Sequence, residues 1–141
     1  MTTIAWDGKT LAADTLITSN GMRVGHARKI GKRGRVLFAA SGCLEFAQPF
    51  LAWCGNGFPG PPPPMKQDDN EAAGLVIFED RIITFSHTGA DTIRAPFYAQ
   101  GSGSPMALGA LHAGASAEDA IKAAMALDTA SGGEIMTLTL E

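Results

Sequence analysis

The hairpin signal near the start of the chain constrains the fold more than any other feature of the sequence. Two short β-like runs, residues 2–6 and 10–15, are separated by Asp7-Gly8-Lys9. An Asp-Gly pair favours a tight turn between antiparallel strands, because glycine tolerates the positive φ that such a turn requires. We therefore expect a hairpin whose second strand places Asp14 beside the first residues of the chain.

The remaining pattern has no alternation of single strands with helices. In the first half of the chain we expect turns at Asn20-Gly21 and at 31–34, a buried strand at 36–40, and a helix at 43–53 that Pro49 kinks or divides. In the second half we expect a hairpin of 73–78 with 81–86, a strand at 97–100 and a helix at 106–113. A helix capped by Ser116 should end near 129, and a strand should follow at 135–140. Residues 55–69, with the run Pro61–Pro64, predict a stiff loop. Antiparallel sheets with helices packed outside them fit this order best, an α+β fold.

Composition excludes several classes of function. A chain of 141 residues predicts a single domain, 1–141, and a net charge of −3 gives no case for binding nucleic acid or an anionic membrane. With neither a signal-peptide pattern nor a long apolar run, we expect a cytoplasmic protein. Cys43 and Cys54 lack CxxC partners, and the three histidines lie at no metal-ligand spacing, so we expect no disulfide, metal or cofactor.

A threonine directly after Met1 carries latent chemistry. Once Met1 is removed, Thr2 has a hydroxyl nucleophile and a free α-amine, and such an amine is a recognised base for threonine. The amine's reference pKa, about 7.7 to 8.0, is close to working pH. A site of this kind also needs a nearby cation, a carboxylate to hold that cation, and donors for an oxyanion. Taken alone, Thr2 is equally an ordinary small second residue.

Six segments in order along the chain carry a resemblance to a known family. They are Met1-Thr2-Thr3-Ile4, Asp14, His26-Ala27-Arg28-Lys29-Ile30, Ala39-Ala40-Ser41-Gly42, Gly101-Ser102-Gly103-Ser104-Pro105 and Asp128-Thr129-Ala130-Ser131-Gly132. Together they resemble the N-terminal threonine peptidases of the proteasome β-subunit and HslV family. The resemblance runs from end to end of the chain and implies a four-layer αββα sandwich of the Ntn-hydrolase type.

The resemblance also implies a role for each matching residue. Thr2 would be the nucleophile and its α-amine the base, and Asp14 would pair with Lys29, which supplies the positive charge. Ser102 would hydrogen-bond near the amine, with Asp128 and Ser131 fixing its orientation. The remaining roles are an oxyanion hole made by the backbone N–H of Ser41 or Gly42, and a substrate pocket lined by Ala27, Ala39 and Cys43, which favours apolar side chains of medium size.

The activity that the resemblance implies is hydrolysis of peptide bonds through an acyl ester on Thr2, without a cofactor. The substrate would be a peptide or an unfolded protein, and the enzyme a homo-oligomeric ring. An ATPase unfoldase partner stays open, because the Pro-rich loop after Trp53 stands where the family continues through a second long helix. Two alternatives stay open as well: a catalytically silent, ring-forming structural subunit, and a small-molecule amidase with the same nucleophile.

Overall fold

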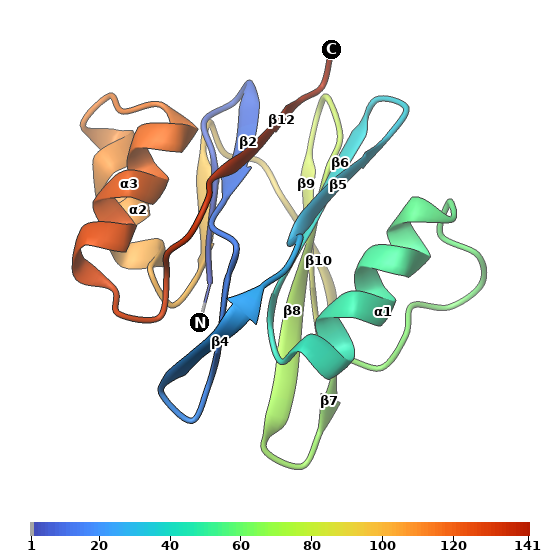
Figure 1. The fold of residues 1–141 in the computed structure, drawn as a ribbon. Helices are drawn as coiled ribbons and strands as arrows, with labels where there is room; N and C mark the ends of the chain where they lie inside the picture. The colour runs from blue at the N-terminus through green and yellow to red at the C-terminus, as the bar shows by residue number, and fades with distance from the viewer. Residues whose placement is uncertain (1) are drawn as a thin grey trace. The chain divides into compact units, whose positions relative to one another are not determined.

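The computed structural model describes residues 2–141, which divide into two compact units. Unit 1 comprises the residues up to Arg28 together with Pro96–Thr139. Unit 2 comprises Lys29–Ala95 with Leu140–Glu141. Each unit contains an antiparallel sheet and at least one helix (Figure 1). The prediction of a single domain stays a prediction.

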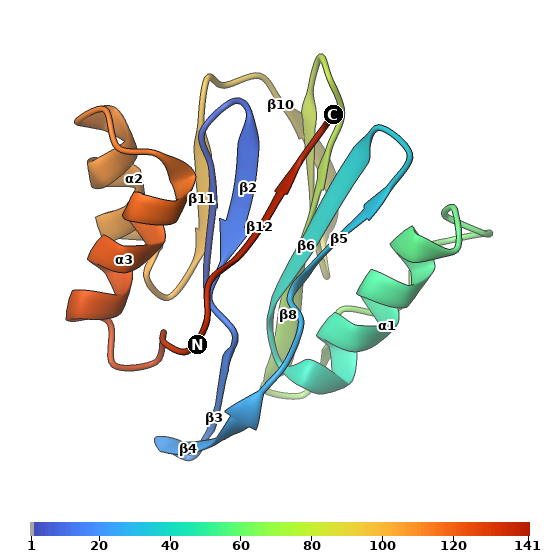
Figure 2. The ribbon, with the colours of Figure 1, turned by 45° about the horizontal axis from the view of Figure 1, so that its top comes forward.

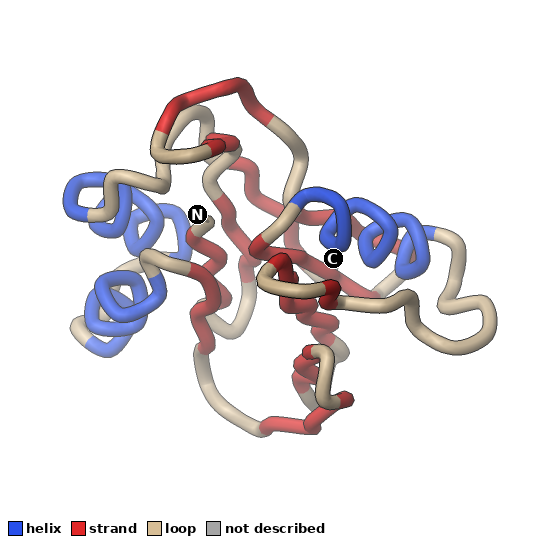
Figure 3. Tube along the Cα trace, turned by 90° about the horizontal axis from the view of Figure 1, so that it is seen from below, coloured by secondary structure: helices blue, strands red, loops and turns tan. Residues whose placement is uncertain are grey.

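Unit 1 is built on a four-stranded antiparallel sheet. Its strand order is β11 (Tyr98–Gly101), β1 (Thr3–Trp6), β2 (Thr10–Ala13) and β12 (Met136–Thr139). Two helices, α2 (Ser104–His112) and α3 (Ala117–Leu127), lie as a pair in this unit (Figure 3). A separate two-stranded ribbon consists of β3 (Leu16–Ser19) and β4 (Met22–His26), joined by the predicted turn at Asn20-Gly21.

The predicted hairpin at the start of the chain is present. Ile4 lies opposite Ala13, and Trp6 lies opposite Leu11. The Asp7 carboxylate closes the turn, since its Oδ1 accepts hydrogen bonds from the Lys9 N–H at 2.9 Å and the Thr10 N–H at 2.7 Å. Asp14 directly follows β2 and therefore lies at the end of the hairpin that also carries the first described residues.

Small side chains let α2 and α3 approach the unit 1 sheet closely. The buried cluster between them consists of Ala5, Ala12, Ala107, Leu111, Ala117, Ala120, Ile121 and Ala124. Ser116 caps α3 as predicted, with its hydroxyl accepting from the Asp119 N–H at 3.1 Å. This cap and this packing hold α3 against the sheet, and the segment after its C-terminus contains Asp128 and Ser131.

Unit 2 is built on a longer antiparallel sheet with one helix against it (Figure 2). The strand order is β10 (Gly89–Ile93), β9 (Ile82–Ser86), β8 (Asn70–Ile77), β6 (Val36–Gly42) and β5 (Ile30–Arg33), and the two-residue β7 (Lys66–Gln67) pairs with β8. Helix α1 (Leu44–Gly55) packs its buried aromatic side chains, Phe46 and Phe50, against β6 and β8.

Three local predictions in unit 2 differ from the structure. Helix α1 runs unbroken through Pro49, which lies on the exposed face, where the Glu45 carbonyl that loses its intrahelical donor can bond to water. Strand β5 continues through the predicted turn at 31–34, and the chain reverses only at Gly34-Arg35. Strand β10 was not predicted, because its sequence is almost entirely polar or small.

The Pro-rich loop predicted at 55–69 is shorter in the structure and covers residues 56–65, because Lys66–Gln67 forms β7 and pairs with β8. No helix within residues 2–141 is long and apolar enough to cross a membrane.

Candidate active site

Thr2 directly precedes β1 and is held by specific hydrogen bonds of its backbone. Its backbone nitrogen donates a hydrogen bond to Ser102 Oγ at 3.1 Å. Only 3% of Thr2 is exposed to solvent, so this nitrogen is held in a largely desolvated place. Met1, whose removal the prediction requires, lies outside the described residues.

The glycines on either side of Ser102 explain how the two chain segments come so close. Gly101 pairs with Thr3 across the sheet and has a φ of +101°, and a Cβ there would overlap the Thr2 carbonyl oxygen. A Cβ at Gly103 would overlap the Thr3 hydroxyl. The predicted Gly-Ser-Gly turn thus lets Ser102 lie directly against the backbone of Thr2.

Asp128 accepts hydrogen bonds from the two serine hydroxyls near Thr2. Its Oδ2 accepts from Ser102 Oγ at 2.6 Å and from Ser131 Oγ at 2.6 Å, and its Oδ1 accepts from the Ala130 N–H at 3.1 Å. Ser131 Oγ also lies 2.7 Å from Thr3 Oγ1. We refer to Thr2, Thr3, Ser102, Asp128 and Ser131 as the threonine network.

The directions of these hydrogen bonds follow from the charge of Asp128. Burial raises the pKa of its carboxyl, but the hydrogen bonds from Ser102, Ser131 and the Ala130 N–H outweigh that cost, and the net effect lowers the pKa. An ionised carboxylate can only accept, so both serines donate to it, and Thr3 must donate to Ser131. Ser102 then has its lone pairs available to accept from the Thr2 nitrogen.

Asp128 also occupies a position that the helix by itself disfavours. It is the C-terminal cap of α3, where the helix dipole places partial negative charge. Since a carboxylate there is unfavourable unless other groups compensate, the two serine hydroxyls and the backbone N–H account for its presence. The network is therefore arranged around a charge, and its other end is the nitrogen of Thr2.

Asp14 is fully buried and joins the same region through the backbone. Its Oδ1 accepts from the Thr3 N–H and its Oδ2 from the Gly132 N–H, each at 2.9 Å. Gly132 directly follows Ser131, so Asp14 fixes the end of the hairpin to the loop after α3. The structure thus brings together five of the predicted catalytic residues in unit 1: Thr2, Asp14, Ser102, Asp128 and Ser131.

The other predicted residues, apart from Ala27, belong to unit 2. Lys29 precedes β5 and is buried, with 5% of its surface exposed. Ala39, Ser41 and Gly42 lie on β6, and Cys43 is the N-terminal cap of α1. These four residues thus surround the junction where β6 passes into α1. Ala27 lies in unit 1, in the wall of a cavity described below.

Thr3 is the member of the threonine network to which the sequence assigned no role. It is fully buried, and it contributes both its N–H to Asp14 and its hydroxyl to Ser131. A hydroxyl-bearing residue in an otherwise apolar buried strand, Thr3–Trp6, is the signal that could have indicated it. Within residues 2–141, no group of three or more His, Cys, Asp or Glu side chains is placed to hold a metal ion.

Solved structures with a similar fold cover nearly the whole chain. The structure of BPH from Thiobacillus denitrificans matches with a TM-score of 0.71 and 25% identity, covering 99% of this chain and 98% of that one. The same protein in complex with epoxomicin matches with a TM-score of 0.70 and 23% identity over the same shares. Eukaryotic HslV from Trypanosoma brucei matches with a TM-score of 0.70 and 20% identity, covering 97% of this chain and 99% of that one. No protein-family model and no curated protein sequence matches the chain.

These similarities show the fold. The chain has the α+β fold of the Ntn-hydrolase type that HslV and proteasome-type proteins share. The resemblance drawn from the sequence motifs is confirmed at this level. The structures that it matches include BPH and HslV.

Proposed function

We propose that the protein is an N-terminal threonine hydrolase that cleaves peptide bonds after Met1 has been removed. The observation that carries the proposal is the hydrogen bond from the Thr2 nitrogen to Ser102 Oγ, with Ser102 bonded in turn to Asp128. Removal of Met1 converts this nitrogen into the α-amine. The amine would then stand where a hydroxyl and a carboxylate already hold it.

The directions within the network suit a base. Because the Ser102 hydroxyl donates its hydrogen bond to Asp128, its oxygen accepts a hydrogen bond from the Thr2 nitrogen. The lone pair of a neutral amine at that nitrogen therefore stays available. Burial of Thr2 favours the neutral amine over the charged ammonium. The amine can therefore take the proton of the Thr2 hydroxyl on the same residue.

In the proposed reaction, Thr2 Oγ attacks the carbonyl carbon of the scissile peptide bond as the α-amine takes its proton. The tetrahedral oxyanion is stabilised by a backbone N–H of Ser41 or Gly42, a role that rests on the motif alone. The C–N bond then breaks, and the amine delivers its proton to the leaving group. Water, with the amine again as base, hydrolyses the ester and frees Thr2.

Lys29 and Asp14 complete the proposal. Lys29 would supply the positive charge that favours the neutral amine, with Asp14 as its partner; this pairing also rests on the motif order. The fold shared with HslV and BPH supports a homo-oligomeric ring with a peptide or unfolded protein as substrate. Native mass spectrometry of the purified protein checks the ring directly.

Epoxomicin provides the test, because a structure of BPH holds this compound. A peptide epoxyketone needs both a hydroxyl and a free α-amine on one residue to form a morpholine ring. We expect one adduct per chain, mapped by peptide mass spectrometry to Thr2, in protein whose intact mass shows loss of Met1. The adduct should be absent from Thr2→Ala and strongly reduced in Lys29→Ala. A protein that begins with Thr2 and stays unmodified would refute the proposal.

A further inference from the structure

A cavity in unit 1 lies beside the threonine network and has no part in the chemistry proposed above. Its volume is about 520 Å³, and its lining residues are Thr15, His26, Ala27, Arg28, Gly133 and Glu134. This volume falls within the range of sites that bind small ligands, roughly 300 to 1,000 Å³. Four of the six lining residues are polar or charged (Thr15, His26, Arg28 and Glu134), unlike the small apolar pocket that the sequence predicted around Ala27.

The walls of the cavity continue directly from the network. Thr15 follows Asp14, and Gly133 follows Gly132, whose N–H Asp14 accepts. The N–H groups of Thr15 and Leu16 both donate to the Gly132 carbonyl, at 3.1 and 3.0 Å. These bonds hold the two wall segments together. The lining residue Thr15 is adjacent to Asp14, and the lining residue Gly133 lies two residues after Ser131, so a molecule in the cavity is close to the network.

His26 is held in the cavity wall by a glycine and a hydroxyl. A Cβ at Gly133, where φ is +79°, would lie 2.6 Å from His26 Nδ1 and 2.7 Å from Thr15 Oγ1, so only glycine lets the ring lie against this backbone. Thr15 Oγ1 donates to the Glu134 carbonyl at 2.9 Å and lies 3.4 Å from His26 Nδ1. Because the Thr15 proton is already used, the bond between them requires His26 Nδ1 to be the donor.

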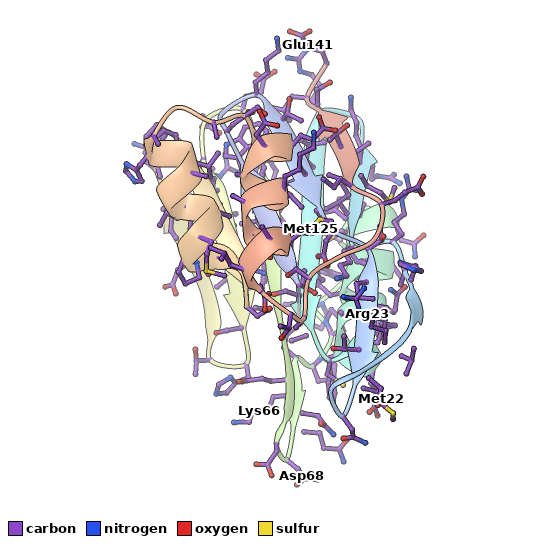
Figure 4. All side chains as sticks on the ribbon, turned by 60° about the vertical axis from the view of Figure 1, so that its left-hand side comes forward. Met22, Arg23, Lys66, Asp68, Met125 and Glu141 are labelled. Atoms are coloured by element: carbon purple, nitrogen blue, oxygen red, sulfur yellow. The ribbon has the colours of Figure 1, made fainter. Side chains whose placement is uncertain are left out.

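Basic groups outnumber acidic groups around the cavity. Arg28 and His26 line it, and Arg23 of β4 reaches Gly132, where an added Cβ would lie 4.0 Å from Arg23 Nη1. Figure 4 labels Arg23, which lies on β4 of the two-stranded ribbon. Glu134 is the single acidic residue in the lining. The side chains of His26, Arg28 and Arg23 are all among the exposed residues, so a ligand entering from solvent can reach them.

We propose that this cavity binds a carboxylate of the peptide substrate, with Arg28 as the residue that determines this specificity and His26 as a second donor, through Nε2 of the doubly protonated ring. The proposal rests on the proposed function, since it names the class of peptide that the Thr2 site would accept. A guanidinium presents five donors in a planar fork that matches a carboxylate in two parallel hydrogen bonds. The carboxylate belongs either to an acidic side chain or to the peptide's own C-terminus.

The test measures binding rather than turnover, by isothermal titration of the Thr2→Ala protein. Three six-residue peptides differ only in their carboxylates: one has glutamate with an amidated C-terminus, one has glutamine with an amidated C-terminus, and one has glutamine with a free C-terminal acid. The glutamate or glutamine is placed at each position of the peptide in turn. We expect at least one of the two acidic peptides to bind about tenfold more tightly than the neutral peptide, as a charge-assisted hydrogen bond implies. Which of the two binds identifies the source of the carboxylate.

Two substitutions assign the effect to the cavity. Arg28→Gln should reduce the preference to about twofold or less, while Lys122→Gln, which removes the same charge from the exposed face of α3, should leave it unchanged. If Arg28→Gln melts at a lower temperature than the parent protein, His26→Gln serves as the second variant and should weaken the preference partially. Equal binding of all three peptides, or a preference that survives Arg28→Gln, would overturn the proposal.

The result stays separate from the test of the proposed function. Acid-selective binding by Thr2→Ala without any epoxomicin adduct on the parent protein would support the cavity and refute the hydrolase. Adduct formation and hydrolysis with no preference for an acidic peptide would refute the cavity alone.

Discussion

The two ends of the β1–β2 hairpin are both organised by carboxylates, but they use them differently. At the turn, Asp7 accepts only backbone N–H groups: those of Lys9 and Thr10, and that of Ala117 at 2.9 Å. At the other end, Asp14 also accepts backbone N–H groups, but Asp128 accepts two serine hydroxyls. Every contact of Asp7 closes a turn or begins a helix, so the fold by itself accounts for it.

The open end contains more polar groups than the fold requires. The strands β1 and β11 pair through their backbones, and this pairing does not use the hydroxyls of Ser102, Ser131 and Thr3. Thr3 and Ser131 are buried, and buried polar groups are costly unless all are satisfied, so a connected network of hydroxyls that leads to one nitrogen indicates a task other than folding. In unit 1, Asp7 therefore serves the fold, and Asp128 serves the groups around Thr2.

The largest expected effect is that of removing the nucleophile. Thr2→Ala should lower the rate of peptide hydrolysis at least about a thousandfold, because no other group can form the ester. Thr2→Ser, which keeps a hydroxyl, should retain measurable activity. Unfolding in urea should show that Thr2→Ala changes stability by less than about 1 kcal/mol, since the substitution leaves the backbone bond to Ser102 in place.

The next effect tests the carboxylate of the open end. Asp128→Asn should lower the rate about a hundredfold, because an amide oxygen that accepts from both serines turns the amide NH2 group toward the Ala130 N–H, and Ser102 would no longer hold the amine in one orientation. Asp119→Asn, an exposed acidic residue on the same helix, is the matched control and should keep the rate. Steady-state hydrolysis of a fluorogenic peptide measures both. Equal rates for the two variants would show that the network has no role in catalysis.

The turn end should behave in the opposite way. Asp7→Asn should leave the rate unchanged and lower the free energy of unfolding by about 2 kcal/mol, since three backbone N–H groups lose a charged acceptor. Burial raises the Asp7 pKa, but these hydrogen bonds outweigh it and the net pKa lies below the reference value of 3.8. The stabilisation is therefore present above pH 3.8 and is lost as pH falls through the lower, folded-state pKa. Urea unfolding of both proteins at pH 7 and pH 3 checks that the difference shrinks in acid.

The smallest effect concerns the hydroxyl of Thr3. Thr3→Val keeps the shape of the side chain but removes the hydrogen bond to Ser131, which should cost about 1 kcal/mol of stability. The rate should fall less than in Asp128→Asn, because Ser102 and Asp128 remain bonded to each other. A loss of activity as large as that of Asp128→Asn would mean that Thr3 belongs to the catalytic groups.

Local chemistry made part of this predictable from sequence. Asp7-Gly8 predicted the hairpin, and the hairpin alone placed Asp14 beside the first residues of the chain. The meeting of Ser102 with Asp128 has no local cause, because a loop after β11 and the end of α3 must be gathered by the fold. The contact between Ser102 and Asp128 was predicted only from the resemblance of the ordered motifs to a known family.

Other features depend on details that a residue pattern does not encode. The pairing of β3 with β4 shifts register between Ile17 and Thr18, an irregularity that the sequence pattern does not reveal. His26 pairs before this shift and Arg23 after it, and the two side chains lie near Gly133 and Gly132 respectively. The cavity therefore could not be predicted, although Ala27 was already expected to line a pocket.

The central claim is that the Thr2 nitrogen becomes a catalytic base when it becomes an amine. Two preparations of the same chain test it most directly: one that begins with Thr2, and one that retains Met1, each confirmed by intact mass. We predict that only the chain beginning with Thr2 hydrolyses a fluorogenic peptide, and that the Met1-bearing chain has no activity above background. Equal activity of the two preparations, or no activity in the chain that begins with Thr2, would contradict the account.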